Sequence, residues 1–288
     1  MNLAIGTVQF GIRYGISNKE GQVNLNKQKE ILSYAQKMGI DMLDTAIEYG
    51  ESEANLGKCG VNNFKLVTKI PPIPNNLINV TEWIEKHVSD AIKRLGLVSL
   101  YGLLLHRSDD LLKYDGEVIR CLKNLKISGV VKKIGVSIYS PHELEKIIDS
   151  NSIDIVQSPF SIVDRRVQTT GWLHKLSSLN IEVHARSIFL QGLLLIPKNK
   201  LPKKFLKWKE LWNKWYTWQA DNPRFTPLHA CLGFVNDMQN IHRIIIGVEN
   251  LKQIEEIVNI KKILEPIDFP NISSDDQELL NPSNWSKL

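Results

Sequence analysis

The 288-residue chain carries 36 Lys plus Arg against 31 Asp plus Glu, a formal net charge of +5, and 43% of its residues are hydrophobic. Residues 198–214 alone hold seven Lys and one Glu, a local charge of +6 that leaves the rest of the chain at −1. A general nucleic-acid binder spreads its basic residues over a whole face, so this distribution argues against one, and we expect no nucleic-acid partner.

The sequence also limits the compartment and the metal chemistry. The N-terminus lacks a basic segment followed by a continuous apolar run, and no segment approaches the roughly 20 apolar residues of a membrane span. We therefore expect a cytoplasmic protein without a membrane partner. Cys59, Cys121 and Cys231 are an odd number of thiols without CxxC spacing. They predict neither a disulfide framework nor a zinc site, and we expect no metal.

Short apolar runs rich in β-branched residues alternate with longer segments of helical period along the whole chain. The runs predict eight strands near residues 3–6, 40–45, 65–70, 98–105, 132–137, 153–158, 181–187 and 242–247. The segments of helical period predict helices over 26–38, 51–59, 79–95, 115–128, 140–149, 167–179, 224–240 and 250–262.

Residues that favour helix N-termini begin several of these segments. We expect Asn26 to cap the first helix, and either Asn79 or Thr81 to cap the third. Ser140 followed by Pro141, with Glu143 beyond it, predicts a cap with proline in the first helical position.

Eight strand and helix pairs in this length fit a closed (β/α)₈ TIM barrel better than an open doubly wound sheet. No linker or change of composition marks a boundary, so we predict one domain over residues 1–288. The alternation is interrupted at about 194–223, which we interpret as an inserted loop with its own helix after strand seven. Such loops lie on the face of the barrel where active sites are built.

Titratable residues stand where the second, third and fourth strands end. Asp44 ends the second strand, and the turn after it contains Tyr49. Lys69 ends the third strand and His106 the fourth. Burying a lone ammonium is costly, which makes Asp44 the expected partner of Lys69.

The residue types at this rim indicate proton transfer to a carbonyl. A phenol is a poor acid at neutral pH, but a nearby ammonium stabilises the phenolate, so we expect Lys69 to lower the pKa of Tyr49. A neutral His106 can hold a carbonyl oxygen by donating a hydrogen bond. No GxSxG sequence is present, and no Ser, His and Asp set suggests a nucleophile with its base.

These residues resemble the catalytic Asp, Tyr, Lys and His of the aldo-keto reductases. The string Asp44-Thr45-Ala46-x-x-Tyr49-Gly50-x-Ser52-Glu53 is followed by Lys69 and His106 in the family's order and spacing. Weaker matches lie at Gly6-Thr7, Gly135-Val136-Ser137, Val156-Gln157, Ser187 to Leu194 and Ile246-Gly247. The resemblance implies a nicotinamide-dependent reduction of an aldehyde or ketone, with Tyr49 as proton donor.

The resemblance also implies a cofactor bound in extended form on the barrel, which agrees with the lack of a GxGxxG sequence. By the family pattern, Ser137 and Gln157 hold the nicotinamide carboxamide, and the segment from Ser187 through Gly192 and Leu193 encloses the pyrophosphate. The adenosine end is expected at the helix start after Gly247, where free N–H groups suit a phosphate. The expected cofactor residues are Ser137, Gln157, Arg186, Ser187, Gly192, Leu193, Gly247, Glu249, Gln253 and Glu256.

Three departures from the family pattern concern the cofactor. Ile138 replaces an Asn that usually contacts the carboxamide, and Arg186 replaces the aromatic residue that commonly stacks on the nicotinamide. In the last motif, Val248, Glu249 and Gln253 replace the hydroxyl and basic residues that usually receive the 2′-phosphate of NADPH. A carboxylate repels that phosphate, so NADH is an alternative to the NADPH that the family suggests, although Lys252 could compensate.

The predicted insert contains aromatic residues on one helix face and lysines on the others. Phe205, Trp208, Trp212 and Trp215 recur at helical spacing, which indicates packing against the barrel. The alternative is that the insert covers the active site, with aromatic rings beside a flat substrate such as a sugar and lysines that attract an anionic one.

The sequence therefore predicts an NAD(P)H-dependent aldo-keto reductase that acts on a small carbonyl compound, either a sugar or an anionic compound. A dehydrogenase running the reverse reaction and a cofactor-binding accessory protein with little turnover stay open as alternatives. An RNA-binding or membrane-surface role of residues 198–214 is a further alternative. The sequence leaves open the physiological substrate, the pathway and the oligomeric state.

Overall fold

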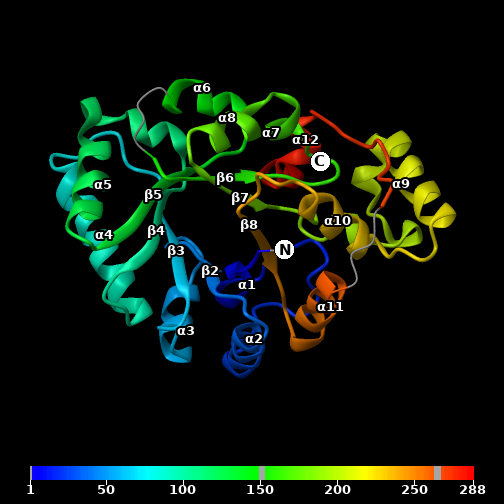
Figure 1. Ribbon diagram of the computed structural model, residues 1–288, viewed down its shortest axis with the longest axis horizontal. Helices are drawn as coiled ribbons and strands as arrows, with labels where there is room; N and C mark the ends of the chain where they lie inside the picture. Colours follow the sequence, from blue (N-terminus) through cyan, green and yellow to red (C-terminus); the bar gives the residue numbers. More distant parts are fainter. Residues whose placement is uncertain (1, 149–152, 263–266) are drawn as a thin grey trace.

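A closed barrel of eight parallel strands forms the centre of the protein (Figure 1) in a computed structural model that describes residues 2–148, 153–262 and 267–288. Each strand pairs with the next in chain order, and β8 closes the ring by pairing with β1. The strands are β1 (Leu3–Gly6), β2 (Met42–Asp44), β3 (Lys65–Ile70), β4 (Leu100–Leu105), β5 (Val131–Ser137), β6 (Ile155–Pro159), β7 (Glu182–Arg186) and β8 (Arg243–Gly247). The TIM-barrel prediction and all eight strands are confirmed.

Helices surround this barrel and connect its strands (Figure 1). They are α1 (Val8–Gly11), α2 (Leu25–Lys37), α3 (Ser52–Cys59), α4 (Val80–Leu95), α5 (Glu117–Ile127), α6 (Leu144–Ile147), α7 (Arg166–Thr169), α8 (Trp172–Ser178), α9 (Lys209–Asp221), α10 (Pro227–Asn236), α11 (Leu251–Lys262) and α12 (Gln277–Leu280). Their buried apolar residues pack on the outer side chains of the strands and form one large core.

A second, smaller core fills the inside of the barrel. Side chains alternate between the two faces of a strand, so every second residue points inward. The inward residues at mid-height are apolar and buried, and they come from six of the strands: Ala4, Met42, Val67, Leu104, Ile155 and Ile245. This apolar layer separates the two ends of the barrel, as expected for a packed interior rather than a pore.

Three helix starts were predicted from capping residues. Asn79 caps α4 by accepting a hydrogen bond from the backbone N–H of Glu82, as predicted. Ser140 and Glu143 form the predicted capping box at Pro141. The prediction for Asn26 is wrong, because Asn24 caps α2 by accepting from the backbone N–H of Lys27 and Asn26 lies inside the helix.

The predicted helix over residues 167–179 is two helices. Gly171, with φ +79°, separates α7 from α8, because this left-handed conformation breaks the helical hydrogen-bond pattern. The predicted helix over 140–149 is a 3₁₀ turn followed by α6, and its last residue lies outside the described part.

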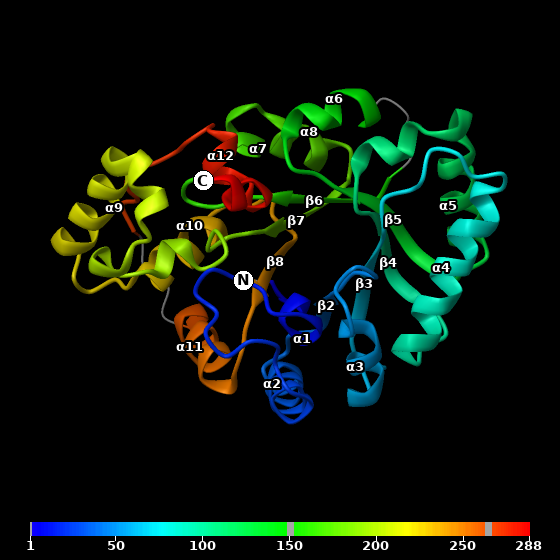
Figure 2. The same cartoon turned by 180° about the vertical axis from the view of Figure 1, so that it is seen from behind.

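The insert after β7 is present and contains α9, which lies at the edge of the molecule beside α10 in both views (Figures 1 and 2). Phe205, Trp212 and Trp215 are buried, which confirms the prediction that the aromatic face packs inward. The C-terminal segment contacts the insert at two places. Trp208 Nε1 donates to Asp276 Oδ2 at 2.8 Å, and the ring of Phe205 meets the ring of Trp285 edge-on.

No helix in the part of the chain that the structure describes is long and apolar enough to cross a membrane.

Candidate active site

The candidate site is the layer of side chains directly above the apolar layer of the barrel. Two residues beyond each inward mid-height position, the next inward side chain stands at the C-terminal end of the same strand. Asp44 thus follows Met42, and Lys69 follows Val67. The eight positions are Gly6, Asp44, Lys69, His106, Ser137, Gln157, Arg186 and Gly247, one from each strand or the residue directly after it.

A buried ion pair lies at the centre of this layer. Lys69 Nζ donates to Asp44 Oδ2 at 2.7 Å and to the carbonyl of Thr45 at 2.8 Å, and both side chains are almost fully buried. Gln157 Nε2 donates to the other oxygen of Asp44 at 2.7 Å. Burial lowers the pKa of Lys69, and the carboxylate of Asp44 opposes that change. The predicted partnership of Asp44 and Lys69 is confirmed.

The loop that carries Tyr49 is packed directly on the first turn after β1. A Cβ at Gly11 would lie 1.6 Å from the carbonyl oxygen of Tyr49, so only glycine fits there. Ser52 fixes the other end of the loop, because its hydroxyl donates to Thr7 and lies 3.0 Å from Thr45 Oγ1. Ser52, two residues after Gly50 in the sequence, therefore supports the loop that carries Tyr49.

Tyr49 reaches from this loop to the other catalytic candidates. Its ring centroid lies 5.0 Å from Lys69 Nζ and 6.0 Å from the ring of His106, which it meets at 78°. The four residues predicted to act together, Asp44, Tyr49, Lys69 and His106, are therefore brought together at one end of the barrel.

The prediction that Lys69 lowers the pKa of Tyr49 is wrong for this arrangement. Burial, followed by the negative charge of Asp44, raises the pKa of Tyr49, and the cation that opposes this is Arg186. The physical reason is that burial of the phenol, which disfavours its charged form, outweighs the effect of nearby cations. Tyr49 is consequently fully protonated at neutral pH and presents an intact O–H donor.

His106 is neutral, as expected. Burial, followed by the positive charges of Lys69 and Arg186, lowers its pKa to about 3. Its Nδ1 lies 2.9 Å from Glu48 Oε2, but the two atoms are not aligned for a hydrogen bond. A neutral ring donates from one nitrogen only, so His106 can orient a carbonyl oxygen without adding a charge.

The catalytic candidates open into a cavity of about 610 Å³. It is lined by three of the four catalytic candidates and nine of the ten expected cofactor residues: Asp44, Tyr49, His106, Ser137, Gln157, Arg186, Ser187, Gly192, Gly247, Glu249, Gln253 and Glu256. Lys69 stands behind Asp44, and Leu193 is buried outside the lining. A cavity of this size suits a cofactor together with a small substrate.

Several lining residues were not predicted. Gln9, Tyr14 and Tyr139 follow the ends of β1 and β5, and Asn281–Ser283 come from the C-terminal segment beyond α12. The two tyrosines were accessible to sequence reasoning, because they stand in loops after strands. The C-terminal segment does not follow a predicted strand, so nothing in its sequence indicated that the folded chain places it beside the cavity.

Two glycines and an unpartnered amide oxygen in the cavity wall leave room and a polar contact for a ligand. A Cβ at Gly247 would lie 2.6 Å from Gln9 Nε2, and one at Gly192, where φ is +88°, would lie 2.1 Å from Ser17 Oγ. The positive φ makes glycine necessary at Gly192, whereas a side chain at Gly247 would displace the end of Gln9. Gln9 Oε1 is buried in the lining without a hydrogen-bond partner among the described residues, which leaves an acceptor for a ligand hydroxyl.

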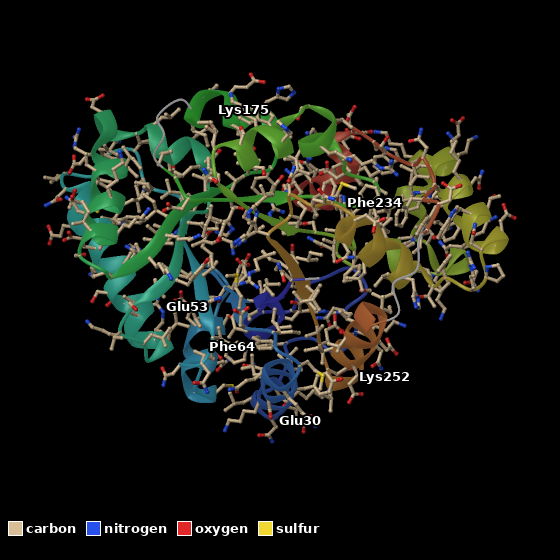
Figure 3. All side chains as sticks on the ribbon, viewed as in Figure 1. Glu30, Glu53, Phe64, Lys175, Phe234 and Lys252 are labelled. Atoms are coloured by element: carbon tan, nitrogen blue, oxygen red, sulfur yellow. The ribbon has the colours of Figure 1, made fainter. Side chains whose placement is uncertain are left out.

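The far end of the cavity is acidic. Glu249 and Glu256 line it, and burial, followed by the charge of Glu20, raises the pKa of Glu249. The side chain of Gln253 accepts from the backbone N–H of Glu249 at 2.8 Å. Lys252 is exposed on α11 at the edge of the molecule (Figure 3) and does not line the cavity.

None of residues 198–214 lines the cavity. The aromatic rings of this segment therefore do not lie beside a substrate in the cavity, whereas attraction of an anionic substrate by its lysines stays a prediction. The aromatic rings are occupied in packing, and Lys204 and Lys207 bond to Trp285 and Glu278 of the C-terminal segment.

Comparisons with known proteins agree with this geometry. The model of the aldo/keto reductase family matches residues 2–272. The chain is 23% identical over 267 residues to "Uncharacterized oxidoreductase YqkF" of Bacillus subtilis (strain 168), covering 83% of this chain and 85% of that protein. It is 27% identical over 192 residues to an "Aldo-keto reductase" of Gibberella moniliformis, covering 60% of this chain and 54% of that one.

A solved structure shares the fold. The holo form of aldo-keto reductase AKR11C1 from Bacillus halodurans superposes with a TM-score of 0.72 at 20% sequence identity, covering 92% of this chain and 88% of that chain.

Proposed function

Because the chain belongs to the aldo/keto reductase family, we propose that it is an NAD(P)H-dependent oxidoreductase that reduces an aldehyde or ketone to the alcohol, with Tyr49 as proton donor. The observation that carries this proposal is the convergence of a protonated phenol, a neutral imidazole and a buried Lys–Asp pair at one end of the barrel. This set suits protonation of a carbonyl oxygen and contains no nucleophile with its base.

In this proposal each side chain has a separate task. Ser137 and Gln157 would hold a reduced nicotinamide, which when bound would supply the hydride for the carbonyl carbon. Tyr49 and His106 hold the carbonyl oxygen, and Tyr49 gives up its proton as negative charge develops there. The resulting alkoxide is a stronger base than a phenolate, so a phenol with a raised pKa still transfers its proton. The positive charge of Arg186 stabilises the phenolate that is left.

Replacing Tyr49 with Phe tests this mechanism. The substitution removes the proton donor but keeps the ring, so we expect kcat for aldehyde reduction to fall by about 100-fold or more. Cofactor binding, measured by fluorescence quenching, should persist. Tyr34→Phe, on α2 outside the cavity, is the matched control. Turnover of Tyr49→Phe at the wild-type rate would exclude Tyr49 as the donor.

For the cofactor we propose NADH in preference to NADPH. The lining carboxylates Glu249 and Glu256 repel a 2′-phosphate, and Lys252 does not line the cavity to compensate. Lys27, whose positive charge acts on Glu249, is itself paired with Glu20. The test is to measure the dissociation constants of NADH and NADPH side by side. Glu249→Gln is expected to narrow the difference between these two constants. A large preference for NADPH in the wild-type protein would contradict this proposal.

The substrate that we propose is a small carbonyl compound, either a sugar or an anionic compound. Oxidation of the corresponding alcohol uses the same groups in reverse. A cofactor-binding accessory protein is the second candidate function, favoured by the departures at Ile138 and Arg186 from the family pattern. Tight cofactor binding without turnover on a broad panel of carbonyl compounds would favour it over the reductase.

A further inference from the structure

Arg186 carries a positive charge into the cavity without a negative partner. Its Nη2 donates to the carbonyl of Ile138 at 2.8 Å and its Nη1 to Ser187 Oγ at 3.1 Å. The guanidinium carbon lies 4.8 Å from the ring centroid of Tyr139. Within the described part of the chain, arginine ion pairs involve Arg94, Arg166 and Arg243, and none involves Arg186. A guanidinium has five N–H donors, so three are left for a ligand.

The position of Arg186 follows from these bonds. Arg186 ends β7, whereas Ile138 follows β5, so the side chain crosses the C-terminal end of β6, the strand between them. His106 follows β4, the next strand on that side. Arg186 lines the same cavity as Tyr49 and His106, and its positive charge acts to lower the pKa values of both.

Tyr14 provides a second donor on the same side of the cavity. Gln191 Nε2 donates to the hydroxyl oxygen of Tyr14 at 2.8 Å, so the phenolic proton of Tyr14 is not used in that bond. Tyr14 and Arg186 both line the cavity, and the charges of Arg186 and Tyr49 both affect the pKa of Tyr14. A guanidinium fork and a phenolic O–H together match the oxygens of a carboxylate or phosphate.

The remaining charges at this end of the cavity do not neutralise Arg186. Asp44 is paired with Lys69, and His106 is neutral. Glu48, beside His106, is half exposed, so water screens its charge. A half-buried cation without a counter-charge is costly, and an anionic group of a ligand would remove that cost.

We propose that Arg186 and Tyr14 form an anion-binding subsite beside Tyr49, so that the substrate is a carbonyl compound that carries a carboxylate or phosphate group. The proposal rests on the reductase function proposed above and narrows its substrate class. The subsite selects the anionic compound over a neutral sugar of the same size. A phosphate of the cofactor has the same chemistry as the substrate group, and the experiment must distinguish the two.

The test compares an aldehyde carboxylate, succinic semialdehyde, with its methyl ester. The measured quantity is the ratio of kcat/KM for the acid to kcat/KM for the ester. Any effect of a substitution on the cofactor or on the chemical step acts on both substrates and cancels in this ratio. We expect Arg186→Met to lower the ratio by about 10- to 100-fold, as for a lost hydrogen bond to a charged group, and Tyr14→Phe by a smaller factor. Arg186→Lys, which keeps the positive charge, should restore part of the lost preference for the acid over the ester.

Lys209→Met removes one positive charge from the insert, outside the cavity, and is the matched control for net charge. An unchanged ratio in Arg186→Met would overturn the proposal. An unchanged ratio together with weakened NADH binding would assign Arg186 to a cofactor phosphate instead.

Absence of turnover in the wild-type protein would contradict the reductase function but not the subsite. In that case, binding of succinate to the protein with NAD⁺ is measured by calorimetry. Arg186-dependent binding of succinate supports the subsite, and binding that Arg186→Met does not change overturns it.

Discussion

At the residue scale, the environment of each titratable side chain decides its role in the site. His106 is only 18% exposed and lies near two cations, so the folded protein strongly favours its neutral form. An unfolded chain exposes the same ring to water, where its ordinary pKa is about 6.5. Between about pH 3 and about pH 6.5 the folded state therefore binds fewer protons than the unfolded state. The free energy of unfolding consequently falls as the pH falls through that range.

His106→Asn should remove this part of the pH dependence. Because the folded pKa of His106 is about 3, its contribution to the free energy of unfolding is full above about pH 6.5 and is lost as the pH falls toward 3. Between about pH 7 and about pH 5 the wild-type protein should lose roughly 2 kcal/mol that the variant does not lose. Urea denaturation of both proteins at both pH values measures the difference. Parallel losses would mean that His106 titrates normally.

Single residues also show how far the sequence could predict the site. The ends of the predicted strands placed Asp44, Lys69 and His106 correctly, because the C-terminal ends of parallel strands meet at one rim of a barrel. The direction of the pKa shift of Tyr49 could not be predicted, since it depends on how deeply the folded chain buries the phenol. The free charge of Arg186 is likewise visible only once its neighbours are known.

At the element scale, the local sequence predicted which strands and helices are present more accurately than it predicted where they begin and end. Asn24 and Asn26 are both good capping residues, and only the backbone shows which one begins α2. Gly171 broke a predicted helix, because one left-handed residue outweighs helical periodicity on both sides. The outward position of the insert depends on contacts with the C-terminal segment, which local pattern does not reveal.

Replacing each asparagine with alanine separates the two caps of α2. Asn24→Ala removes the acceptor for the N–H of Lys27, so the free energy of unfolding should fall by about 1 kcal/mol. Asn26→Ala places a better helix former at an exposed helical position, so its effect should be near zero or slightly stabilising. Urea denaturation curves of the two variants provide the measurement. A larger loss of stability in Asn26→Ala than in Asn24→Ala would mean that Asn26 is the cap.

At the scale of the whole molecule, we propose that residues 1–288 form one domain, since the barrel closes only when β8 pairs with β1. The chain termini contribute to the same site: Gly6 ends β1, and Asn281–Ser283 line the cavity. The net charge of +5 belongs to the insert at the edge of the molecule and not to the cavity. The charge that matters for a substrate is then the single guanidinium of Arg186.

Neutralising the insert should therefore leave catalysis nearly unchanged. Six of its lysines are exposed, and one of them, Lys207, is paired with Glu278. Replacing the other five with Gln brings the formal net charge from +5 to zero: Lys198, Lys200, Lys203, Lys209 and Lys214. At physiological salt the screening length is about 8 Å, so charges outside the cavity contribute little to binding within it. We expect kcat/KM for succinic semialdehyde to change by less than about two-fold at that salt concentration. A salt titration of both proteins is the measurement, and a loss of ten-fold or more in the neutralised protein would mean that the insert steers anionic substrates into the barrel.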